Sequence, residues 1–194
     1  MVSAVRAPRP ATLADLAGLP EDVRGEIIDG ELVEKATPTA EHGTAQLAVG
    51  AQLFSAFHRR AGEGSPGGWW LMTEVEVVYQ DDQVYRHDIV GSRRERTAVK
   101  PKGSPVRIRP DWVCEVLSPT NAGNDLVKKF RTLAKHSVPH YWIVDPEHRT
   151  LTVFRWTADG YLTALTADQN EVVRAEPFEA VELDVALLFG DEDT

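Results

Sequence analysis

Residues 109–120 read RPDWVCEVLSPT, and they contain the strongest strand signal of the chain. The central run WVCEVL is apolar except for Glu115, and prolines stand on both sides of it. A short apolar run bounded in this way is typical of a buried strand. A carboxylate inside such a strand costs several kcal/mol unless it is paired, protonated or bound to a metal ion. Glu115 is therefore either half of a buried salt bridge or a candidate metal ligand.

A second acid in an apolar segment is Asp88, in VYRHDIVG at residues 84–91. Adjacent strands lie roughly 5 Å apart, so acids on two neighbouring central strands can bind one divalent cation. Without that cation two carboxylates so close would repel each other. Because oxygen ligands favour hard metals, we expect Asp88 and Glu115 to bind Mg²⁺ or Mn²⁺.

Asp111 also precedes Glu115 on the predicted strand, but by four residues. At about 3.3 Å per residue the two Cα atoms are roughly 13 Å apart, too far to share one ion comfortably. We expect Asp111 to bond a backbone amide or a basic residue near the start of the strand.

A helix is predicted from Asn124 to about His136, and Lys129 lies on it. At about 100° per residue Lys129 is roughly 40° outside Leu133, at the border of the buried face, from which it can reach toward Glu115. A lysine there can stabilise developing negative charge or orient a water. An ordinary pair with Asp125 at i, i+4 is the simpler alternative. The predicted apolar stripe is Leu126, Val127, Phe130, Leu133 and Ala134.

An earlier helix is predicted over about residues 40–60, and His42 and Gln46 lie at the N-terminal end of its predicted buried face. Buried polar groups need partners, so these two side chains either surround the site or are satisfied within the core. A helical wheel assigns the rest of that face to Leu47, Gly50, Leu53, Phe54 and Phe57.

The remaining elements give an α/β or α+β fold with a mixed central sheet flanked by helices. Asp29-Gly30 between two apolar runs indicates a hairpin within residues 24–34. The other predictions are a helix over 13–19, strands over 69–79, 84–90, 108–117, 141–144, 151–156 and 161–165, and a short helix over 183–189.

The composition predicts one domain over residues 21–190, after an N-terminal arm with a short helix at 1–20 and before an acidic tail at 191–194. The single cysteine, Cys114, excludes a disulfide or cysteine-based zinc site within the chain. No segment is apolar enough for a membrane span or a signal peptide, so we expect a cytoplasmic protein. Walker, G-x-S-x-G and G-x-G-x-x-G motifs are absent.

The net charge of −9 argues against a protein that coats nucleic acid, yet residues 93–109 hold seven basic residues and one acidic residue. Such a segment can contact a few phosphates, and Arg93, Arg94 and Arg96 are the candidates. A solvated loop is the alternative interpretation.

The run RPDWVCEVLSPT, followed by DLVKKF at 125–130 and SVPHYWIVDP at 137–146, resembles the Uma-type family of predicted restriction endonucleases in the PD-(D/E)XK superfamily. GEIIDGELV at 25–33, His42 and RHDIVG at 86–91 also resemble that family, although His87 stands where proline is usual. The similarity extends from about Arg24 to Phe189.

The resemblance implies a restriction-endonuclease-like fold, with Asp88 and Glu115 as the two acids. The superfamily lysine usually follows the second acid by two positions, where this chain has Leu117, and the resemblance places its replacement at Lys129. Leu133 stands where relatives commonly have tyrosine. Glu26 and Glu31 match N-terminal acids of the family, and Glu31 is a candidate neighbour of the site.

The expected function is therefore Mg²⁺-dependent hydrolysis of phosphodiester bonds in DNA, with Asp88, Glu115 and Lys129 as catalytic residues. The resemblance also suggests a homodimer. The alternative is a catalytically inactive nuclease fold that serves as an interaction or regulatory module, which the negative net charge favours.

Overall fold

The computed structural model describes residues 9–62, 66–118 and 122–191. The helices are α1 (Leu13–Ala17), α2 (Ala40–Phe57), the π-helix η1 (Asn124–Lys129), α3 (Phe130–Lys135) and the 3₁₀-helix η2 (Ala186–Phe189). The strands are β1 (Gly25–Ile28), β2 (Glu31–Glu34), β3 (Trp69–Gln80), β4 (Gln83–Arg93), β5 (Trp112–Val116), β6 (His140–Asp145), β7 (Thr150–Thr157), β8 (Gly160–Asp168), β9 (Val172–Val173) and β10 (Leu183–Asp184).

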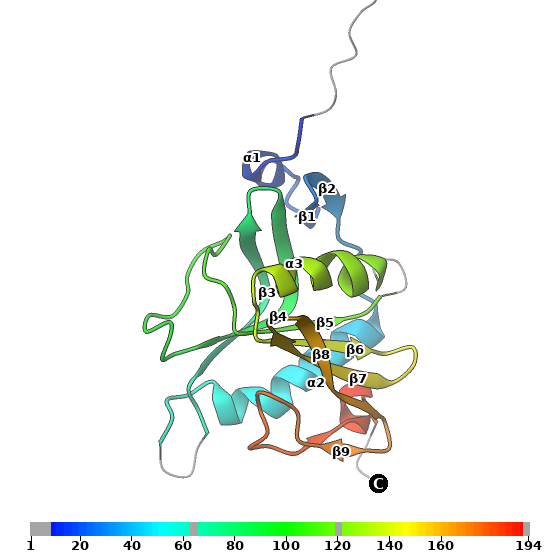
Figure 1. The fold of residues 1–194 in the computed structure, drawn as a ribbon. Helices are drawn as coiled ribbons and strands as arrows, with labels where there is room; N and C mark the ends of the chain where they lie inside the picture. The colour runs from blue at the N-terminus through cyan, green and yellow to red at the C-terminus, as the bar shows by residue number, and fades with distance from the viewer. Residues whose placement is uncertain (1–8, 63–65, 119–121, 192–194) are drawn as a thin grey trace, which may run out of the picture.

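Strands β1 to β8 form one mixed sheet in the order β2-β1-β4-β5-β6-β7-β8, with β3 paired to β4. Among the described strands of this sheet, β5 and β6 form the one parallel pair, because the helices η1 and α3 connect them. The predicted class, a mixed central sheet with flanking helices, is confirmed. Figure 1 shows the small β9–β10 ribbon and η2 beside α2, below the main sheet.

Two helices cover opposite faces of the sheet (Figure 1). Helix α2 packs through Val49, Leu53 and Phe57 on a core that includes the buried Trp112. Helix α3 packs through Leu133 on a second core around Tyr141. Strand β5 lies between these layers, so a charged side chain on it is shielded from water on both sides.

The hairpin β1–β2 forms as its turn residues predict. Ile28 pairs with Glu31, and Asp29 and Gly30 between them have φ values of 53° and 77°. Positive φ at both central residues is the signature of the tight turn whose twist suits a hairpin. This hairpin joins the sheet next to the start of β4, where Ile27 pairs with Val84.

Three element predictions are wrong. The predicted strand 108–117 begins only at Trp112, since Pro110 cannot donate to a ladder and the Asp111 carboxylate accepts the N–H of Arg93 at the end of β4. The predicted helix 183–189 is the strand β10 followed by a single 3₁₀ turn. The predicted buried face of α2 is wrong in part: Leu53 and Phe57 are buried as expected, but Leu47 is 73% and Phe54 52% exposed.

The helix around Lys129 departs from the predicted wheel in a way that affects the site. Residues 124–129 form a π-helix, whose wider turn moves each side chain away from its α-helical position. Leu126 and Val127, expected in the core, are 46% and 44% exposed, while Asp125 and Lys129 are buried. The wider turn therefore exposes the apolar side chains of Leu126 and Val127 and buries the charged pair Asp125 and Lys129.

Candidate metal and active site

Asp88 and Glu115 lie on the adjacent strands β4 and β5. The antiparallel register pairs Ile89 with Cys114, which brings Asp88 opposite Glu115. The Asp88 backbone N–H lies 3.4 Å from Glu115 Oε2, and Asp88 Oδ2 accepts a 2.8 Å hydrogen bond from the Val116 N–H. Both side chains are 1% exposed. The structure thus brings the two predicted acids together in a nearly dry environment.

Lys129 reaches this site from η1 and is itself 1% exposed. Its Nζ lies 2.8 Å from Glu26, 2.9 Å from Asp125 and 3.3 Å from Glu115. Lys129 therefore reaches Glu115, as the helix position predicted, and it also forms the predicted i, i+4 pair with Asp125. Burial alone would lower the pKa of Lys129, but these three carboxylates outweigh it and raise the pKa well above its ordinary value. Lys129 is a fixed positive charge.

Lys35, which no sequence pattern indicates, is the second cation of the site. Its Nζ donates to Asp88 Oδ1 at 2.6 Å and to the Arg86 carbonyl at 2.7 Å. An ammonium has three donors, so one N–H remains beyond these two bonds. Lys35 also lines the small cavity beside Asp88 and Glu115. Its sequence context, one position after the end of β2, carries no local signal for this role.

His42 and Gln46 approach Asp88 from the start of α2. His42 Nε2 lies 3.4 Å from Asp88 Oδ1, and Gln46 Nε2 donates to the Asp88 carbonyl at 3.0 Å. His42 Nδ1 is buried and finds no hydrogen-bond partner among the described residues. The structure places Glu31 apart from this group, exposed on β2, and brings Glu26 to Lys129 instead.

His87 also contacts Glu115, although the spacing of the histidines in the sequence does not indicate a site residue. It is fully buried, with Nδ1 2.5 Å from Glu115 Oε1 and Nε2 2.8 Å from the Tyr79 hydroxyl. Burial lowers the pKa of His87 to about 3, so the ring is neutral at neutral pH. Burial also raises the Tyr79 pKa, which keeps its hydroxyl protonated. We assign Tyr79 as donor to Nε2 and Nδ1–H as donor to Glu115.

The two strand acids, Asp88 and Glu115, have opposite pKa shifts. Burial raises the pKa of Glu115 to about 8 although Lys129 opposes the shift. Burial would also raise the pKa of Asp88, but the contacts from His42 and Lys35 outweigh it, and the pKa lies below its ordinary value. Burial raises the pKa of Asp125 to about 7. At neutral pH Asp88 is ionised, whereas Glu115 and Asp125 each retain a large share of a proton.

The charges of the buried group do not balance when all its acids are ionised. Four carboxylates, on Glu26, Asp88, Glu115 and Asp125, face the two ammonium groups of Lys35 and Lys129. The excess is two negative charges. The cavity beside them measures about 10 Å³, which is room for one water molecule. The site therefore needs two protons or two further positive charges to be neutral.

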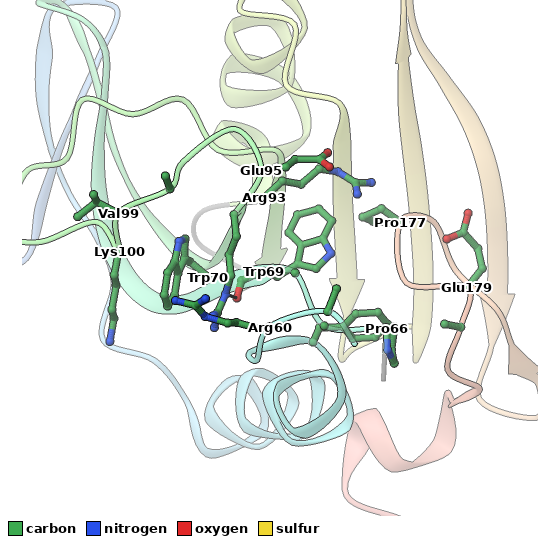
Figure 2. Close-up of a pocket in the computed structure, with 17 residues that line it drawn as sticks. Arg60, Pro66, Trp69, Trp70, Arg93, Glu95, Val99, Lys100, Pro177 and Glu179 are labelled. Atoms are coloured by element: carbon green, nitrogen blue, oxygen red, sulfur yellow. Dashed lines mark hydrogen bonds between the residues drawn. The ribbon is translucent and has the colours of Figure 1, made fainter. Parts of the chain in front are cut away.

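The predicted phosphate contacts lie at the far end of β4. Arg93 and Arg94 line a larger cavity near the end of α2 (Figure 2). Arg96 is bound within the protein, because its Nε donates to Asp111 Oδ1 at 2.7 Å. Asp111 also accepts the Arg93 N–H at 2.7 Å, which confirms its expected bonding to a backbone amide and a basic residue.

The fold of this chain is shared with a protein whose structure has been solved. The structure is similar to the crystal structure of a "putative nuclease belonging to DUF820" from Anabaena variabilis ATCC 29413. The TM-score is 0.72 at 24% sequence identity, with 93% of this chain and 98% of that chain covered. A search of curated proteins finds no match.

The sequence profile of the Uma2 family, described as "Putative restriction endonuclease", matches residues 10–186. This chain belongs to the Uma2 family. The resemblance inferred from its motifs is confirmed. Within the described residues, no helix has the length and apolarity that crossing a membrane requires.

Proposed function

We propose that this chain is a Mg²⁺-dependent endonuclease that hydrolyses phosphodiester bonds in DNA. The observation that carries the proposal is the group of four buried carboxylates around Asp88 and Glu115, which has an excess of two negative charges when all four are ionised. A buried excess of this size destabilises the fold unless something compensates it. One divalent cation supplies the two missing charges.

The donor set suits Mg²⁺. Oxygen ligands favour a hard cation, and Mg²⁺ is usually held by one or two carboxylates, its other ligands being waters and substrate phosphates. In the described part of the chain, no three or more His, Cys, Asp or Glu side chains form a metal-binding group. Among the described residues, Glu115 Oε2 has a single long contact, 3.4 Å to the Asp88 N–H, and His42 Nδ1 can bond a further group.

Asp88 and Glu115 would hold the ion, which when bound activates water and polarises the phosphate. Lys129 acts as a positioning residue, because its three N–H groups face three carboxylates and fix the direction of Glu115. His87 fixes Glu115 from the other side. Lys35 is better placed than Lys129 to contact substrate, since it has an N–H to spare beside the cavity. This assignment differs from the catalytic role expected for Lys129.

Cleavage of plasmid DNA tests the proposal. Purified protein is expected to nick supercoiled plasmid with Mg²⁺ or Mn²⁺ and to stop with EDTA. Glu115→Gln and Asp88→Asn are expected to lose at least 100-fold in rate, while Lys128→Gln, on the same helix as Lys129, keeps its activity. Equal nicking by wild type and both acid variants would show contamination. The same assay with RNA of matching sequence tests whether the protein cleaves DNA, RNA or both.

A non-catalytic role is the alternative, and the small cavity and the fully engaged Lys129 favour it. Calorimetric titration with Mn²⁺ separates the two proposals when no substrate is cut. Binding that disappears in Glu115→Gln supports the metal site, whereas no binding by the wild type favours an interaction module. A homodimer is part of the proposed function, and light scattering measures it.

A further inference from the structure

A second cavity, of about 900 Å³, lies at the C-terminal end of α2. Its wall combines the end of α2, the start of β3 and the residues that follow β4. In Figure 2, Trp70, Arg60 and Lys100 surround one part of it, and Pro177 and Glu179 lie at the other. Helices rise about 1.5 Å per residue, so Phe57 at this cavity is roughly 22 Å from His42 at the acid site. The cavity is separate from the site of the two acids.

Hydrogen bonds hold the cavity wall in one arrangement. The Arg94 N–H donates to the Gly68 carbonyl at 2.8 Å, and the Trp70 indole donates to the Thr97 carbonyl at 2.9 Å. The Gly67 N–H donates to the Ala56 carbonyl at 3.1 Å. These bonds connect the three segments that form the wall, so the cavity exists before any ligand arrives.

Four cations line the cavity: Arg60, Arg93, Arg94 and Lys100. Among the described residues, none of the four is within salt-bridge distance of a carboxylate, although many arginines elsewhere are. Two acids, Glu95 and Glu179, also line it, which leaves a local charge of +2 on a chain of net charge −9. Unpaired cations concentrated on an acidic protein favour an anionic ligand.

The cations are combined with aromatic rings. The Arg94 guanidinium lies 3.6 Å above the Trp70 ring, and its Nε donates to the Trp69 carbonyl at 3.0 Å. The Arg93 guanidinium lies 4.6 Å from the Trp69 ring. A guanidinium held over an indole has a second face, and nucleic-acid bases stack on guanidinium planes.

We propose that this cavity binds an unpaired segment of a nucleic-acid strand, with phosphates at Arg60 and Lys100 and a base stacked on Arg94. A paired base is covered by its neighbours in the duplex, so only an unpaired base can use the stacking surface. This inference rests on the proposed function, because it assigns to a nuclease a contact with its substrate away from the cleavage position. The strand would be held there while another part of it reaches Asp88 and Glu115.

Fluorescence anisotropy in EDTA measures this binding without cleavage. A labelled single-stranded oligonucleotide is expected to bind wild type more tightly than a blunt duplex of the same sequence. The variant Arg60→Gln/Lys100→Gln removes two exposed cations and is expected to bind about tenfold more weakly at 0.1 M salt. Its plot of log K against log salt should be shallower by about 1.4, since each single-strand phosphate contact contributes about 0.7.

Two further variants separate charge from stacking. Arg94→Lys keeps the charge but loses the planar group, so it should weaken binding and leave the salt slope unchanged. Arg131→Gln/Lys135→Gln removes the same charge from α3, on the other side of the sheet, and should bind as wild type does.

Equal affinity of wild type and Arg60→Gln/Lys100→Gln would overturn the proposal, as would duplex binding that is as tight as single-strand binding. Displacement of the oligonucleotide by micromolar AMP would assign the cavity to a free nucleotide instead. These results are independent of catalysis. A protein that binds strands here but never cleaves would refute the proposed function alone, and a nuclease unaffected by these variants would refute this inference alone.

Discussion

Replacing Glu115 by glutamine is expected to stabilise the metal-free protein at neutral pH. The folded pKa of about 8 lies above the value of about 4.3 for an unfolded chain, so Glu115 takes up a proton on folding. Such a group lowers stability progressively as pH rises from about 4 to about 8, and not below that window. Glutamine has nearly the same shape and no charge, so the variant lacks this penalty.

The size of the effect follows from the pKa difference. Each pKa unit corresponds to about 1.36 kcal/mol, so at pH 7 the cost of protonating Glu115 on folding is about 3–4 kcal/mol. The amide fits the backbone N–H of Asp88 less well than a carboxylate does, which offsets about 1 kcal/mol. We therefore expect Glu115→Gln to be more stable than wild type by about 2–3 kcal/mol at pH 7, and less stable than wild type by about 0.5 kcal/mol near pH 4.5.

Urea unfolding at pH 4.5, 7 and 8.5, with EDTA or with Mg²⁺, measures these differences. A bound ion stabilises the folded state by about 2.7 kcal/mol at 100 times its Kd. Wild type should show this gain, and Glu115→Gln should not. Asp125→Asn is the matched control. It removes a carboxyl whose pKa burial raises to about 7 but retains both metal ligands, so it should keep the response to Mg²⁺.

A destabilised Glu115→Gln variant at pH 7, or a stability difference that does not change with pH, would refute the charge argument. A gain from Mg²⁺ as large in Glu115→Gln as in wild type would place the ion elsewhere. Loss of the gain in Asp125→Asn would mean that the ion depends on the whole acidic group rather than on the pair.

Three other changes test the surroundings of the site and the core. Lys129→Met leaves three buried carboxylates without their shared cation, so urea unfolding at pH 7 should show a loss of about 3–5 kcal/mol in stability. The double variant Lys129→Met/Glu115→Gln should recover part of that stability. An unchanged unfolding midpoint in Lys129→Met would contradict the buried contacts. Burial, and secondarily Arg93, lower the pKa of His140 to about 4, so wild type should lose stability as pH falls from about 6.5 toward 4. Relative to His140→Asn that loss should be about 2 kcal/mol at pH 5, and parallel pH profiles of the two proteins would exclude it. Gly91→Ala would bring a methyl group within 3.0–3.1 Å of Trp69, Leu71 and Trp112, so thermal unfolding should show a loss of about 1–3 kcal/mol, and a stabilised variant would show that this core has spare room.

Much of the fold could be predicted from local pattern. The Asp29-Gly30 turn, the apolar runs around Asp88 and Glu115, and the helix that contains Lys129 are encoded by residues close together in the chain. Hydrophobic periodicity and turn residues are local features, so they can be recognised in the sequence itself. Helical wheels were less informative, because a wheel assumes the regular turn that η1 does not have.

The sequence by itself determined that two acids stand in buried strands and that a basic segment separates them. Only the tertiary structure decided which groups surround those acids. Lys35 lies 53 residues from Asp88, and His87 lies 28 from Glu115. Their contacts follow from strand register and hairpin docking, which depend on packing across the whole sheet rather than on neighbouring residues. The net charge of the site is the sum of charged side chains from β1, β4, β5 and η1 and from Lys35 after β2, so it can be determined only from the folded structure.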